Sequence, residues 1–121
     1  MVKVGDIFCN SWGWEQTQVD FYEVVRVSKT GKTGDLRPIG FEWTNPDDQN
    51  CNSVVPSVNG KQRYSSQNWD VRKNRRFSMD DKYGYRIWVN VAERADRSGY
   101  MQACSWNGTS LYFTPRNQPG Y

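Results

Sequence analysis

The clearest alternation of hydrophobic and polar side chains runs from Val19 to Val27, in the sequence VDFYEVVRV. A period of two residues is typical of a strand whose two faces meet different environments. A glycine-rich turn in residues 28–35 follows, and residues 36–43, LRPIGFEW, predict the returning strand of a hairpin. Pro38 lies inside that second strand, and because it has no backbone N–H we expect it at a sheet edge or a bulge.

A second alternating segment covers residues 85–91, YRIWVNV. It predicts a strand with two sets of side chains: Tyr85, Ile87, Val89 and Val91 inward, and Arg86, Trp88 and Asn90 outward. Less regular segments predict further strands in residues 2–8 (with a bend at Gly5 and Asp6), 100–106 and 110–115.

Turn and loop signals separate these segments. Asn59-Gly60 and Asn107-Gly108 are dipeptides of the kind that closes two-residue hairpins. Residues 44–53 have no periodicity and predict an exposed loop. Residues 68–79, NWDVRKNRRFSM, fit either a strand or a short helical turn.

The composition favours strands over helices. Twelve valines and three isoleucines stand against two leucines and three alanines, and β-branched residues suit a pleated surface whereas Leu and Ala favour helices. Six tryptophans and seven tyrosines supply further apolar area. We predict a single domain over residues 1–121. It is all-β, with at most one short helix, and forms a small antiparallel SH3-like barrel or sandwich of about six to eight strands.

Residue content disfavours several kinds of chemistry. The chain has no histidine, which removes nucleophilic catalysis with a histidine base. Its three cysteines are too widely spaced for a paired zinc site. We therefore predict a protein that is not an enzyme, with no catalytic residue, cofactor or metal. A nuclease-like metal site drawn from the carboxylates of Asp6, Glu15, Asp20 and Glu23 stays open as a third interpretation.

The cysteines and the apolar runs also bear on the compartment. An odd, sparse set of cysteines fits a reducing environment better than a secreted disulfide framework, and Cys104 alternates with apolar residues like a small core residue. No apolar run is long enough to cross a membrane, and Met1 is not followed by a basic and apolar leader. We predict an intracellular protein without membrane association.

Charge is distributed unevenly between the two halves of the chain. Residues 1–60 hold five Lys/Arg and eight Asp/Glu, a net charge of −3, whereas residues 61–121 hold eleven and five, a net charge of +6. The positive side chains of residues 61–76 are interleaved with aromatic rings. Cations neutralise phosphates and exposed rings stack on bases, so this stretch predicts nucleic-acid binding by Lys61, Arg63, Trp69, Arg72, Lys73, Arg75 and Arg76. The alternative is a solvated edge strand that its charges protect from aggregation.

The stretch SWGWEQTQ, residues 11–18, has two interpretations as well. Trp12 and Trp14 could anchor a partner while Gln16 and Gln18 contact its hydrogen-bonding edges. Alternatively, the polar side chains hold a long loop in shape and the tryptophans cover one end of the barrel. The second interpretation is favoured because such a loop needs many internal hydrogen bonds.

Three segments resemble small uncharacterised proteins of bacteriophages and bacterial mobile elements: GDIF-CNSWGWEQTQVDFYEVVRV, LRPI and WNGTSLYFTP. The likeness covers the first 40 residues well, the last 15 moderately and the middle hardly at all. Asn107 stands where those proteins have aspartate, and the C-terminal histidine of the group is missing. The resemblance implies an accessory protein in the cytoplasm of a bacterial host cell, without naming a mechanism.

Three functions follow from these observations. The first is non-catalytic binding of nucleic acid or a nucleoprotein through the basic, aromatic stretch. The second is inhibition of a host defence enzyme through the Trp12 and Trp14 surface. The third is a metal-dependent carboxylate enzyme.

Overall fold

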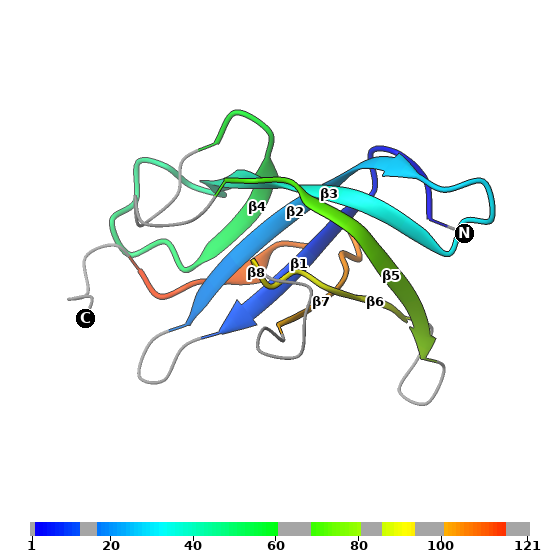
Figure 1. Cartoon of the computed structure of the whole chain (residues 1–121). Coiled ribbons are helices and arrows are strands. Elements are labelled where there is room, and N and C mark those ends of the chain that lie inside the picture. The colour runs from blue at the N-terminus through cyan, green and yellow to red at the C-terminus, as the bar shows by residue number, and fades with distance from the viewer. Residues whose placement is uncertain (1, 13–16, 61–68, 81–85, 94–100, 116–121) are drawn as a thin grey trace.

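The computed structural model describes residues 2–12, 17–60, 69–80, 86–93 and 101–115 (Figure 1). These residues form strands and no helix, which confirms the all-β prediction. The strands are β1 (Ile7–Trp12), β2 (Gln18–Val27), β3 (Thr33–Trp43), β4 (Ser53–Ser57), β5 (Arg72–Asp80), β6 (Arg86–Asn90), β7 (Gln102–Ser105) and β8 (Leu111–Tyr112). The ambiguous segment at 68–79 is thus largely a strand, and the described part of the chain contains no helix long and apolar enough to cross a membrane.

Six of the strands close into an antiparallel barrel. β1 pairs with β2 on one side and with β7 on the other, and β6 connects β7 to β5. The long strand β3 pairs with both β5 and β2, which completes the ring (Figure 1). The result is a small SH3-like barrel, one of the two architectures that the sequence predicted.

The remaining strands, β4 and β8, lie outside this ring. β4 pairs with the end of β3 from Gly40 to Trp43, and β8 pairs with β4. Pro38 lies between the end of the β3–β5 ladder at Leu36 and the start of the β3–β4 ladder. Pro38, which has no N–H to donate to a ladder, therefore lies where β3 changes partners, and this position fits the expectation of a sheet edge or a bulge.

The core consists of two clusters on opposite faces of β1, β2 and β3. The barrel interior holds Val2, Phe8, Tyr22, Val24, Leu36, Val89, Val91 and Ala103. The outer face holds Cys9, Val19, Phe21, Ile39 and Phe41, which pack against Val54 and Phe113 from the segments of β4 and β8. Strand β2 is therefore covered on both faces, which is why it carries apolar side chains on each: Val19 and Phe21 on the outer face, and Tyr22 and Val24 on the inner one.

Two local predictions were wrong. The first strand does not cover residues 2–8: Gly5, at a φ of 96°, bends the chain, and β1 then continues through Trp12 into the expected loop. A turn forms at Asn107-Gly108, but it closes no hairpin, because β7 pairs with β1 and β6 while β8 pairs with β4. A turn also forms at Asn59-Gly60, and the residues that would continue it into a hairpin lie outside the described part of the chain. At the Asn59-Gly60 turn, the backbone of Gly60 packs so closely on Gly40 that a methyl group added at Gly40 would collide with Gly60.

Candidate nucleic-acid interface

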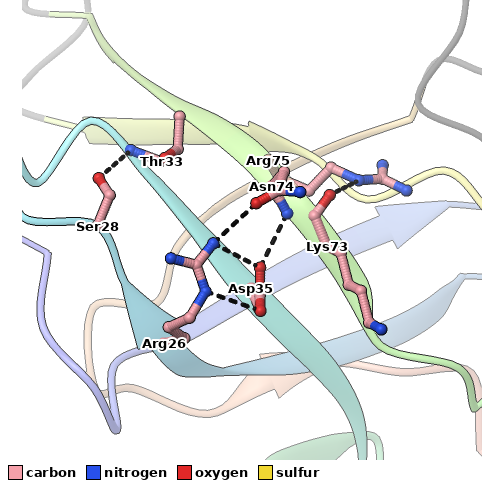
Figure 2. A network of polar contacts seen from close by, with 7 residues as sticks. All are labelled: Arg26, Ser28, Thr33, Asp35, Lys73, Asn74 and Arg75. Carbon is pink, nitrogen blue, oxygen red and sulfur yellow. Dashed lines mark hydrogen bonds and ion pairs between the residues drawn. The ribbon is translucent and has the colours of Figure 1, made fainter.

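A bulge in β5 sets the direction of the basic side chains. Asn74 has a φ of 55°, in the left-handed region, and the β3–β5 register shifts between Gly34 and Leu36 at the same level. Figure 2 shows how this conformation is held: the Asn74 backbone N–H donates to Asp35 Oδ1 at 2.8 Å. Arg26 Nη2 donates to Asn74 Oδ1 at 2.8 Å, and Arg26 also forms a two-pronged ion pair with Asp35. Its hydrogen bond lowers the pKa of the Asp35 carboxyl.

Because of the bulge, two arginines three positions apart both turn inward. In a regular strand Arg72 and Arg75 would point to opposite faces, yet their residues are only 4% and 5% exposed. Arg72 Nε donates to the Val91 carbonyl at 2.8 Å, and its guanidinium lies 5.8 Å from the centre of the Tyr22 ring. The Arg72 guanidinium therefore contacts a carbonyl and an aromatic ring within the barrel.

Arg75 is likewise occupied by the backbone around it. Its guanidinium donates to the carbonyls of Lys73 at 3.2 Å, Asn90 at 3.0 Å and Glu93 at 3.5 Å. Burial, and then the charge of Arg72, lower the pKa of Arg75. These bonds tie β5 to the end of β6, so a change at Arg72 or Arg75 affects the fold as well as any ligand.

The other predicted contact residues lie differently. Lys73 and Arg76 are exposed on β5, and Trp69 is exposed just before it. Lys61 and Arg63 lie outside the described residues. Of the seven predicted nucleic-acid contacts, the structure therefore places Trp69, Lys73 and Arg76 at the surface and Arg72 and Arg75 inside.

Arg76 borders a groove of about 320 Å³ on the outer face of β5, β6 and β7. Ser78 and Trp88 are partners across the β5–β6 ladder, and Asn90 and Gln102 are partners across the β6–β7 ladder. The groove is lined by Asn74, Arg75, Arg76, Ser78, Trp88, Val89, Asn90 and Gln102. Unlike the outer face of β1, β2 and β3, this part of the barrel wall is not packed into the second core cluster.

The groove combines three kinds of chemistry that recognise a nucleotide. The Trp88 ring offers a surface for stacking, as the outward prediction for this residue implied, and it is partly exposed. Arg76 offers a charged donor for a phosphate. The amides of Asn90 and Gln102 offer donors and acceptors for base edges, although Asn90 Oδ1 already accepts from the backbone N–H groups of Ala92 and Met101.

This groove was not predicted as a site, although the alternation of residues 85–91 contained part of the signal. Trp88 and Asn90 were predicted to point outward from their strand, but they were not connected to the basic stretch. Gln102 was not singled out. The connection needs the pairing of β6 with both β5 and β7, which the spacing along the chain does not give.

The Trp12 region favours the structural interpretation in part. Trp12 is 46% exposed, and its Nε1–H donates to Asp20 Oδ2 at 2.7 Å. Burial raises the pKa of Asp20, while the Trp12 hydrogen bond opposes that shift. Gln18 is only 2% exposed, and Trp14 and Gln16 lie outside the described residues. The surface of this region that the structure describes is therefore mainly Trp12.

The carboxylates of the third interpretation are dispersed among other partners. Asp20 accepts from Trp12, Glu23 forms an ion pair with Arg37 at 2.8 Å, and Asp6 accepts from the Lys3 backbone N–H at 3.0 Å. Glu15 lies outside the described residues. Across the described ranges, no group of three or more Cys, Asp or Glu side chains could hold a metal ion.

No protein-family model matches the chain, and neither the curated proteins nor the solved structures contain a significant match to it.

Proposed function

We propose that this protein binds single-stranded nucleic acid, without catalysis, through the groove on the outer face of β5, β6 and β7. The observation that carries the proposal is the position of Trp88 and Arg76 along one groove of about 320 Å³. A ring beside a cation matches the repeating unit of a single strand, in which a base alternates with a phosphate. On the resemblance described above, we further propose that the protein is itself an accessory protein of a phage or mobile element.

Charge around the groove favours an anionic partner. Lys73 and Arg76 are exposed on β5, and the turn that contains Lys29 and Lys32 lies beside Arg76, since the Phe77 N–H donates to the Lys32 carbonyl at 2.9 Å. The basic residues 61–121 carry the net charge of +6. A cluster of cations next to a stacking ring raises the local concentration of nucleic acid and speeds its association.

The test is a titration of a fluorescently labelled single-stranded DNA or RNA at low salt, followed by anisotropy. Trp88→Ala removes the stacking surface and should weaken binding by roughly 5- to 150-fold, because base stacking on one ring is worth about 1–3 kcal/mol. Arg76→Glu reverses the charge at the groove and should weaken binding further than Arg76→Gln.

A charge-matched control is available at Lys3, an exposed residue that does not line the groove. Lys3→Glu changes the net charge as much as Arg76→Glu does, so it should reduce affinity much less. Equal losses from the two variants would show that only the overall charge matters. Affinity unaffected by Trp88→Ala would remove the groove as the binding site.

A second candidate function is binding of a host protein through the exposed ring of Trp12. Tryptophan is enriched among the side chains that carry the energy of protein interfaces. Trp12→Ala should then abolish a stoichiometric protein complex and leave nucleic-acid affinity unchanged. A Trp88→Ala variant that loses nucleic-acid affinity and keeps any protein complex supports the first proposal.

A further inference from the structure

Two of the three cysteines, 95 positions apart in sequence, face each other in the barrel. Cys9 on β1 and Cys104 on β7 are register partners in the antiparallel β1–β7 ladder. Directly opposed residues of such a ladder have Cα atoms about 4.5 or 5.5 Å apart. Disulfide bonds accept Cα separations of about 4.4–6.8 Å. Both cysteines are free thiols in the structure.

The surroundings of the pair prepare one sulfur for reaction. A hydrogen bond links the side chains of Cys9 and Cys104, and Arg86 Nη1 lies 4.0 Å from Cys104 Sγ. The Cys9 hydrogen bond, and then the Arg86 charge, lower the pKa of Cys104, whereas the same hydrogen bond and burial raise the pKa of Cys9. A thiolate stabilised by a thiol donor and a cation is the nucleophilic form of cysteine.

Solvent access also favours reaction at Cys104 over Cys9. Cys9 is buried in the outer core cluster, and Cys104 is only partly buried. Cys104 is also the register partner of Trp88 in the β6–β7 ladder, so its strand position adjoins the wall of the groove. A small oxidant that arrives from solvent therefore meets Cys104 first.

We propose that Cys9 and Cys104 form a modification site at which a hydroperoxide is reduced and a reversible cross-strand disulfide is made. The Cys104 thiolate attacks the terminal peroxide oxygen, the O–O bond breaks, and a sulfenic acid forms. The leaving hydroxide or alkoxide takes up a proton from solvent to give water or an alcohol. Cys9 sulfur then attacks the sulfur of the sulfenic acid, an S–S bond forms, and the hydroxyl leaves as water with the Cys9 proton. Two electrons pass from the sulfur pair to the peroxide, and a dithiol reductant reverses the change.

The third cysteine provides an internal reference. Cys51 lies in the loop between β3 and β4, where its sulfur is 3.4 Å from Thr44 Oγ1. That hydrogen bond is the main reason that the pKa of Cys51 is lowered to about 7. Cys51 is therefore itself an ionisable thiol, but it lies in a loop, outside the ladder that brings Cys9 and Cys104 together.

The experiment treats the full chain with hydrogen peroxide, alkylates the remaining thiols, and measures the intact mass and the linked peptides. We expect one alkylated thiol, at Cys51, and a linked peptide pair that contains Cys9 and Cys104. A Cys51→Ser chain should form the same bridge. Alkylation of all three thiols after peroxide, or bridges that form only between molecules, would overturn the proposal.

Single variants separate the steps. Cys9→Ser should stop at a sulfenic acid that a dimedone probe captures, and Cys104→Ser should lose most of its peroxide reactivity outside Cys51. Arg86→Gln should slow the loss of the Cys104 thiol several-fold at neutral pH and move the pH profile of that rate upward. An unchanged profile would contradict the role given to Arg86, and equal sulfenic acid formation in the two serine variants would contradict the order of attack. None of these readouts depends on nucleic-acid binding.

Discussion

Asn74 determines which side chains β5 presents to solvent. Its left-handed conformation lets Arg72 and Arg75 turn inward together and leaves Arg76 at the groove. Asparagine suits the position for two reasons. It tolerates a positive φ better than most residues, and its side-chain oxygen accepts the Arg26 hydrogen bond.

Substitution at this residue separates the two reasons. Asn74→Ala should lower the free energy of unfolding by about 2 kcal/mol, because it adds backbone strain and removes a hydrogen bond. Asn74→Gly relieves the strain and should cost about 1 kcal/mol or less. Urea denaturation of both variants measures the difference. If glycine costs more than alanine, the bulge does not depend on the left-handed conformation.

Asp20 gives a prediction about pH. Its pKa is raised in the folded state, first by burial, so the folded chain holds this proton more tightly than the unfolded chain does. The stability that this provides is fully present below the unfolded pKa and is lost as the pH rises through the folded pKa. Asp20→Asn keeps an acceptor for Trp12 and removes the titration.

Asp20→Asn should therefore gain stability relative to the natural protein as the pH rises from below 3.8, the ordinary value for aspartate, to neutrality. Urea denaturation at several pH values measures this gain. Asp47→Asn, in the exposed loop, is the matched control and should shift the curve little. If the free energy of unfolding of Asp20→Asn fell relative to that of the natural protein as the pH rises, the result would contradict the direction of the pKa shift.

At the scale of elements, β4, β8 and the residue after them act as a second layer. Phe113 is buried and packs on Phe41 and Trp43, with ring centres 4.8 and 5.3 Å apart. Phe113→Ala should lower the free energy of unfolding by about 3–5 kcal/mol, through lost burial and a cavity. Tyr112→Ala, one position earlier and exposed, should change it by less than about 0.5 kcal/mol. Comparable losses in the two variants would mean that the layer is not a core.

The elements also show how far the sequence predicts this fold. The alternation of residues 19–27 and 85–91 gave β2 and β6 because each has a clear period of two. The helical alternative at 68–79 stayed open because the bulge at Asn74 breaks that period inside β5. The turn at Asn107-Gly108 was recognised, but the strands on either side of it pair with other partners, and a turn motif carries no information about that pairing.

The candidate site was predicted only in part for a related reason. The basic stretch was visible as composition, but the bulge decides which of its arginines reach solvent, and ladder pairing decides that Trp88 and Gln102 lie beside them. The same holds for Cys9 and Cys104, which are widely separated in sequence and adjacent in the sheet. Contacts between distant strands are a property of the closed barrel.

At the scale of the whole molecule, the barrel divides its outer surface into two functions. Over β1, β2 and β3 the outer face is packed beneath the β4 and β8 segments, whereas over β5, β6 and β7 it carries the groove. The first part contributes stability, and the second is the part that we propose binds nucleic acid. The net charge of +3 is small, so binding must depend on where the cations lie and not on their total.

The most direct test of this account is the salt dependence of affinity for a single-stranded oligonucleotide. The logarithm of the binding constant should fall linearly with the logarithm of salt concentration, with a slope of about −0.7 for each phosphate neutralised. Arg76→Gln should make the slope shallower by roughly one contact, whereas Trp88→Ala should lower affinity and leave the slope unchanged. Absence of binding at low salt, or a slope that Arg76→Gln does not alter, would contradict the assignment of the groove.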